Sequence, residues 1–249
     1  AEVDAALAAS PRDPDALGKA VSWNRSGWPE FDLYRPIVQA GLQAGLPVLA
    51  ANLPRKVARE VVSKGAAALD APLRARLEKE GPLPARLVES LRAEMRESHC
   101  GELPESMLDP LILAQRARDA RMSERLASAG ARGAILIAGK GHVRTDRGVP
   151  AYLAADAPGR RVVSVAFIEV DPDEKEPQGY SEHGESGPLP YDYAVFTPGE
   201  KREDPCEGLR HRAREREKKD VAEREGETRA PAAPASPDAA GAEAPRDGR

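Results

Sequence analysis

The chain is poor in several residue types, and each scarcity excludes a class of protein. Only two of its 249 residues are cysteines, which rules out a disulfide-rich scaffold and a four-cysteine zinc or iron–sulfur site. Basic residues are not in excess, because 37 Lys and Arg face 41 Asp and Glu, for a net charge of −4. This balance argues against a general nucleic-acid binder. No apolar run approaches the roughly 18 residues of a membrane-spanning helix, and aromatic residues make up only 4% of the chain.

The composition changes near residue 208, and this change predicts the end of the folded domain. Residues 209–229 intersperse basic and acidic side chains with almost no large aliphatic residue, so this segment has no face to bury. Residues 230–249 are rich in Ala and Pro, a composition typical of disordered segments. We therefore expect one α/β domain over residues 1–208, followed by a charged and then Ala/Pro-rich disordered tail over residues 209–249.

Within this domain, helices alternate with short apolar strands. Helical spacing and helix-end residues predict helices over residues 34–44, 55–64, 72–79, 84–97 and 104–129. Apolar runs predict strands over residues 46–51, 134–138, 162–170 and 191–197. This pattern favours an α/β fold with a largely parallel sheet covered by helices on both faces. Because about four strands are few for this many helices, we expect the sheet to be incomplete at the N-terminus.

The longest predicted helix carries two polar residues within an otherwise apolar stripe. Gln115 and Asp119 lie one turn apart on the face that also presents Ile112 and Met122. A buried amide or carboxylate costs a few kcal/mol unless it is hydrogen-bonded or paired with a charge. Two interpretations stay open: the pair bonds to a neighbouring loop and holds the fold together, or this face borders a polar ligand pocket.

A second candidate site follows the predicted strand over residues 134–138. There the segment 139–144 reads GKGHVR, and its glycines permit a tight turn at the end of a strand, where open α/β sheets bind ligands. We expect His142 and Arg144 to meet Gln115 and Asp119 in one polar pocket, with Arg144 as a candidate partner of the Asp119 carboxylate. His99, next to Cys100, is a third candidate, either as a ligand of a metal or cofactor or as a packing residue at a helix junction.

Several segments, taken in order, resemble the ChaN family. They lie between residues 23 and 207 and read WNRSGWP (23–29), YRP (34–36), ANLP (51–54), HCG (99–101), AQRARD (114–119), GKGHVR (139–144), GVP (148–150) and DPCE (204–207). The family consists of bacterial envelope proteins, often iron-regulated lipoproteins, and is grouped with the Tiki metalloproteases. The resemblance implies haem binding for iron acquisition, haem held between the subunits of a homodimer, a tyrosine as iron ligand, and a location in the cell envelope.

For a haem-binding protein of this kind, we expect the cofactor-binding residues to come from the matching segments and from the polar pocket. They are Tyr34, Tyr152, Trp28, His99, His142, Arg144, Gln115, Asp119 and Asn52. Core packing is the alternative for the aromatic members. Cys100 and Cys206 lie in two of the matching segments, and in an oxidising compartment they either form a disulfide or remain free thiols.

The chain departs from the superfamily pattern in one respect that bears on function. The superfamily carries two Gly-x-x-His motifs, and only the second, ending at His142, is found here. We therefore expect a ChaN-like domain that lacks its first strand–helix unit, and no lipidation cysteine. The alternative function is a metal-dependent hydrolase in which His142 and a carboxylate bind a divalent ion. Since a catalytic metal generally needs three protein ligands, a haem-binding protein is favoured over an enzyme.

Overall fold

The computed structural model describes residues 2–10, 12–129, 133–171, 173–180 and 188–199, together with residues 204, 206–208, 211, 214 and 215. It divides into two compact units. One comprises Ala1–Met95 and Pro104–Glu200, and the other comprises Arg96–Leu103 and Lys201–Arg249. The predicted tail, residues 209–249, falls almost entirely outside the described residues, so that prediction stays a prediction.

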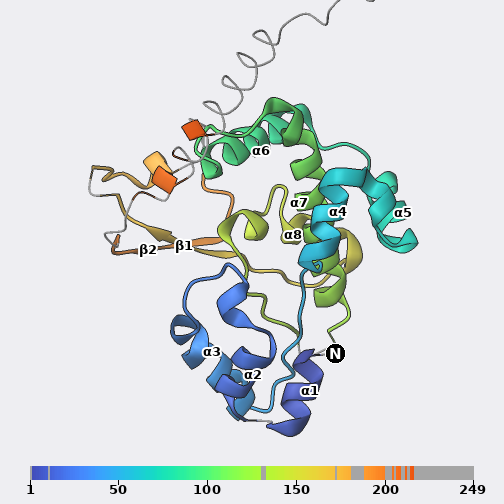
Figure 1. Cartoon of the computed structure of the whole chain (residues 1–249), viewed down its shortest axis with the longest axis vertical. Helices are drawn as coiled ribbons and strands as arrows, with labels where there is room; N and C mark the ends of the chain where they lie inside the picture. The colour runs from blue at the N-terminus through green and yellow to red at the C-terminus, as the bar shows by residue number, and fades with distance from the viewer. Residues whose placement is uncertain are drawn as a thin grey trace, which may run out of the picture. The chain divides into compact units, whose positions relative to one another are not determined.

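Helices dominate the described chain, as Figure 1 shows. The α-helices are α1 (Glu2–Ala9), α2 (Pro14–Ala20), α3 (Phe31–Gln43), α4 (Arg55–Lys64), α5 (Ala71–Glu80), α6 (Ala85–Ser98), α7 (Leu108–Ala127) and α8 (Val149–Asp156). Short 3₁₀ turns are η1 (Trp23–Arg25), η2 (Gly65–Ala68), η3 (Glu105–Met107), η4 (Lys140–Val143) and η5 (Pro177–Tyr180). The two strands are β1 (Val165–Glu169) and β2 (Tyr193–Thr197). All five predicted helices are present, and their ends lie within a few residues of the predicted ones.

A buried apolar cluster lies among helices α4, α5, α7 and α8. Figure 1 shows these helices together. Val61 of α4 and Leu73 of α5 are fully buried there against the small residue Ala117 of α7. Small residues on α7 let its neighbours approach closely, and the Asp70 carboxylate caps α5 by accepting a hydrogen bond from the Leu73 amide. Helix α7 therefore packs against α4, α5 and α8. The polar residues of its stripe are fixed with it.

The two strands form a parallel pair, and this part of the fold prediction is confirmed. Val165 is paired with Tyr193 and Phe167 with Val195, so these four side chains share one face of the sheet. That face is exposed, Phe167 at 69% and Tyr193 at 63%. The expectation of helices on both faces is therefore wrong for the described part of the chain.

Two predicted strands have no strand partner. Residues 46–51 and 134–138 carry the expected apolar side chains, but neither segment pairs with another strand among the described residues. Ile135 is 89% exposed and Leu49 60%. The prediction of two further strands is wrong for a physical reason: an apolar run gives a segment its tendency to extend, whereas a strand also requires a neighbour that accepts its backbone hydrogen bonds.

The second unit contains the disulfide between Cys100 and Cys206. The bond joins two segments 106 residues apart in the sequence, with an S–S distance of 2.01 Å. Of the two states left open by the sequence, the structure shows the oxidised one. Within the described residues, no helix has the length and apolar composition needed to cross a membrane.

Candidate functional site

The centre of the candidate site is a buried pair of side chains, one from α7 and one from η4. The Nδ1 atom of His142 lies 2.5 Å from Oδ1 of Asp119. Both residues are buried, with 7% and 3% of their surfaces exposed. Burial raises the pKa of the Asp119 carboxyl, and the hydrogen bond to His142 opposes this effect. The predicted meeting of the helix stripe with the GKGHVR turn is thus observed.

Gln115 and Arg118 extend this pair along α7. The Nε2 atom of Gln115 lies 3.1 Å from Nδ1 of His142 and 3.3 Å from its Nε2. Its Oε1 accepts a hydrogen bond from Nη1 of Arg118 at 3.3 Å, and Nε of Arg118 donates to Oδ1 of Asn52 at 3.1 Å. Four of the predicted residues, Gln115, Asp119, His142 and Asn52, therefore lie in one hydrogen-bonded chain. Sequence reasoning did not select Arg118, although the segment AQRARD contains it.

Arg144 has a different partner from the one predicted. Its Nε and Nη2 atoms donate to the two carboxylate oxygens of Asp146 at 2.9 and 2.7 Å, as a two-bond fork. Burial by itself would raise the pKa of Asp146, but the hydrogen bond and the positive charge of Arg144 outweigh it and lower that pKa. Arg144 is 1% exposed. The prediction that Arg144 pairs with Asp119 is wrong. Asp146, two positions further along the chain, binds the guanidinium instead, and a fork to such a near neighbour orders little extra chain.

A second group of predicted residues forms an aromatic turn, which we define as Trp23, Trp28, Phe31 and Tyr34. The ring of Trp23 lies 5.6 Å from that of Trp28, 5.2 Å from Phe31 and 5.0 Å from Tyr34, measured between centroids. Its Nε1 atom donates to the carbonyl of Pro29 at 2.8 Å, which closes the turn. Trp28 is exposed and Tyr34 half-buried. The hydroxyl of Tyr34 has no hydrogen-bond partner among the described residues.

One short segment connects the aromatic turn to the buried pair. Asn52, at its beginning, accepts the hydrogen bond from Arg118. Arg55, three residues later, donates from Nη1 to the carbonyl of Arg25 in the turn at 2.5 Å. The segments 23–29, 51–54, 114–119 and 139–144, which carry the resemblance, thus form one continuous bonded region.

Two other predicted site residues lie elsewhere. Tyr152 is buried in the apolar cluster, where its hydroxyl accepts a hydrogen bond from Nε of Arg116 at 3.3 Å. Burial raises the pKa of this phenol, and the nearby charge of Arg116 opposes the rise. This placement favours the packing role that the sequence left open. His99 belongs to the second unit, with its Nδ1 atom 3.2 Å from Oγ of Ser98.

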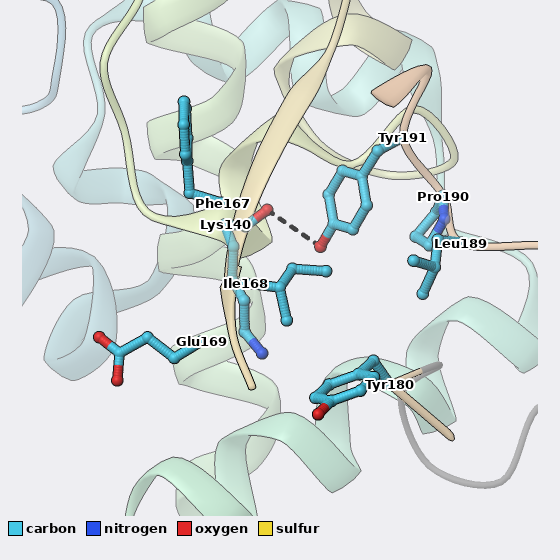
Figure 2. A pocket seen from close by; sticks show the side chains of 8 residues that line it. All are labelled: Lys140, Phe167, Ile168, Glu169, Tyr180, Leu189, Pro190 and Tyr191. Carbon is cyan, nitrogen blue, oxygen red and sulfur yellow. Dashed lines mark hydrogen bonds between the residues drawn. The ribbon is translucent and has the colours of Figure 1, made fainter. Parts of the chain in front are cut away.

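A cavity of about 340 Å³ opens beside β1. Figure 2 shows Ile168 on the side of β1 that faces Tyr191, Leu189 and Tyr180, with Phe167 and Glu169 on the other side of the strand. The Tyr191 hydroxyl lies 3.5 Å from the carbonyl oxygen of Lys140. Lys140 begins η4, so this cavity adjoins the turn that holds His142. The sequence analysis did not select any residue that lines this cavity as a site residue. Apart from Lys140, they come from segments predicted only as strands or loops.

The described residues contain no group of three His, Cys, Asp or Glu side chains arranged to hold a metal ion. His142 directs Nδ1 at Asp119, and Gln115, which is not one of those residue types, contacts the ring. This arrangement orients an imidazole, as in sites where a carboxylate fixes the ring and its tautomer.

A comparison with known protein families matches the part of the chain that contains this bonded region. The model of the family described as "Haem-binding uptake, Tiki superfamily, ChaN" matches residues 2–153, more than half of the chain. The chain belongs to this family. The match includes the aromatic turn, Asn52, Arg118 and the His142–Asp119 pair, and so confirms the resemblance derived from the motifs.

A solved structure supports the same fold. It is described as "Cofacial heme binding to ChaN of Campylobacter jejuni", and the alignment has a TM-score of 0.53 at 20% sequence identity. It covers 70% of this chain and 64% of that chain, so the present chain spans just under two thirds of the length of that protein. At this identity the match shows the ChaN-like fold alone. No curated protein matches the chain.

Proposed function

We propose that this chain binds haem on its aromatic turn and serves in iron acquisition. The observation that carries the proposal is the apolar surface formed by Trp23, Trp28 and Tyr34, with cationic side chains at its border, in a chain of the haem-binding uptake family. Haem is a flat apolar ring with two carboxylates. It therefore requires both an aromatic wall and nearby positive charge.

The residues present fit that group. Arg55 is exposed, and its Nη2 atom lies 3.9 Å from where a Cβ at Gly27 would be, so its charge lies directly beside the turn. Neither Arg55 nor Arg25 makes an ion pair within the described chain. The solved ChaN structure from Campylobacter jejuni is described as binding haem, which supports the same ligand here.

Tyr34 is the residue that we propose as the iron ligand. Tyrosine is an established axial ligand of haem iron, and the Tyr34 hydroxyl is not engaged by any described residue. By contrast, the hydroxyl of Tyr152 is bound to Arg116, and that of Tyr180 to the backbone of residues 171 and 174. When bound, the haem would supply an iron centre with an open position for an axial ligand. The chain provides the binding surface and the anionic oxygen.

The same surface supports the proposal of a homodimer. On α3, next to Tyr34, the side chains of Leu33 and Ile37 are 69% and 53% exposed, one turn apart. A haem lying on the turn would leave its other face open, and a second copy of the chain would cover it together with these aliphatic groups. We also propose a location in the cell envelope, and the Cys100–Cys206 bond is compatible with it, because disulfides form and persist in oxidising compartments.

A hemin titration tests the proposal. The purified chain should give a saturable Soret shift, and Tyr34→Phe should weaken binding and alter the iron spectrum, because it removes the phenol oxygen while keeping the ring. Tyr193→Phe is the matched control, since the Tyr193 hydroxyl is exposed and also makes no hydrogen bond among the described residues. A wild-type titration no different from that of an unrelated protein of similar charge would reject haem binding. Equal behaviour of the two variants would reject Tyr34 as the ligand.

A further inference from the structure

We infer that Arg118 is the anchor for a carboxylate of the ligand, so that this side chain recognises a haem propionate. The inference rests on the proposed haem binding and assigns a role to a residue that the family motif contains but that no motif reasoning selected. It is carried by the bonding of Arg118, its burial and its position in the bonded region.

Arg118 and Arg116 differ from the other partly or fully buried arginines around α7, because neither makes an ion pair with a described residue. Arg116 donates to the Tyr152 hydroxyl and the Gly81 carbonyl. Arg76 is paired with Asp156 at 2.8 Å, Arg121 with Glu124 at 2.8 Å, and Arg147 with Glu94 at 2.6 Å. Arg144 has the carboxylate of Asp146. Arg118 makes no ion pair with any described residue. Its two bonds go to the neutral amide oxygens of Asn52 and Gln115.

Because Arg118 is partly buried, its guanidinium is unfavourable without an anionic partner. The side chain of Arg118 is partly buried, and burial lowers its pKa, while the nearby Asp119 opposes that effect. The Asp119 carboxylate is already engaged by His142 at 2.5 Å. A guanidinium withdrawn from water in this way gains from an anion that supplies the missing charge, since hydrogen bonds between ionised groups are the strong ones.

The two amide bonds also orient the guanidinium. Nε is held by Asn52 and Nη1 by Gln115, and no nitrogen of Arg118 is both buried and without a partner. Nη2, which makes no hydrogen bond with a described residue, is therefore not fully buried. A planar guanidinium with its orientation fixed binds carboxylates by two parallel hydrogen bonds, whereas a lysine ammonium has no such geometry.

Arg118 is linked to the aromatic turn by two hydrogen bonds and the short segment between Asn52 and Arg55. Asn52, its partner, precedes Arg55 by three residues, so the Cα atoms of Asn52 and Arg55 are at most about 11 Å apart. Arg55 itself contacts the turn through the carbonyl of Arg25. An anchor at Arg118 therefore requires that a ring stacked on Trp28 and Tyr34 turn a propionate edge toward Asn52, which binds Arg118.

The test compares hemin with hemin dimethyl ester, in which both propionates are esterified, in the same detergent-containing buffer. Arg118→Gln should weaken hemin binding about tenfold, the loss expected for one charge-assisted contact. It should leave the affinity for the ester unchanged. The matched control is Arg125→Gln, an exposed arginine two turns further along α7 that alters the net charge equally. This variant should bind both ligands like the wild type.

Each outcome separates the inference from the proposed function. If Arg118→Gln weakens hemin and the ester equally, its role is structural and the carboxylate assignment is overturned. Unchanged hemin binding by Arg118→Gln overturns it as well. If the wild-type chain shows no saturable binding of either ligand, the haem proposal itself fails. A thermal melt of both variants checks that each is folded during the titration.

Discussion

His142 and Asp119 are 23 residues apart in sequence, yet Nδ1 of one lies 2.5 Å from Oδ1 of the other in a buried environment. The bond fixes the imidazole in one orientation and connects the turn η4 to the middle of α7. Because Gln115 contacts the same ring and also accepts a bond from Arg118, the pair supports the side chain to which we assign ligand recognition. We therefore expect this pair to position other groups.

Replacing Asp119 should show how much this pair stabilises the fold. Asp119→Ala leaves the buried His142 without its acceptor and should lower the free energy of unfolding by about 2–3 kcal/mol, the cost of an unsatisfied buried polar group. Asp119→Asn retains an acceptor oxygen and should cost less. Urea denaturation of the two variants measures the difference. An alanine variant as stable as the asparagine variant would contradict the proposed hydrogen bond.

The fork between Arg144 and Asp146 should make stability depend on pH at the acid end. The pKa of Asp146 is lowered from its ordinary value of 3.8, so the stabilisation is present above that value and is lost as the pH falls through the lower, folded-state pKa. Asp146→Asn should therefore cost about 1–2 kcal/mol at pH 7, a figure reduced for the partial exposure of the carboxylate. The gap to wild type should close below pH 3.8. A gap that stays constant down to pH 2 would contradict the assignment.

Gly148 should be required for the geometry of the His142 turn. A Cβ added at this position would lie 2.4 Å from the carbonyl oxygen of His142 and 2.8 Å from that of Arg144, both backbone atoms that cannot give way cheaply. Gly148→Ala should destabilise the chain by about 1–3 kcal/mol and weaken ligand binding. The control is Gly41→Ala within α3, where a Cβ meets nothing within 4 Å. That change should stabilise by about 0.5–1 kcal/mol. Calorimetry of both variants distinguishes them by sign.

The Cys100–Cys206 bond predicts that the native protein carries no free thiol. Alkylation of unreduced, denatured protein should leave its mass unchanged, and alkylation after reduction should add two labels. Cys100→Ser should lower stability by up to about 4–5 kcal/mol, the chain-entropy limit for a loop of this length. Two labels without reduction would mean that the thiols are free.

The amino-acid sequence determined those features whose causes are local. The helix predicted over residues 55–64 is observed as Arg55–Lys64, because a helix satisfies its backbone hydrogen bonds within its own segment. The stripe that places Gln115 and Asp119 on one face of α7 likewise follows from the helical period, and a short connection brings His142 to it.

Tertiary structure alone decided the features that require a distant partner. Residues 46–51 and 134–138 have the apolar runs of strands, but pairing depends on a neighbour whose position no run of residues encodes. The choice of Asp146 over Asp119 by Arg144 and the burial of Tyr152 among helices depend in the same way on which groups lie together after packing. So does the significance of Arg118, since only the folded chain shows that its neighbouring carboxylate is already occupied by His142.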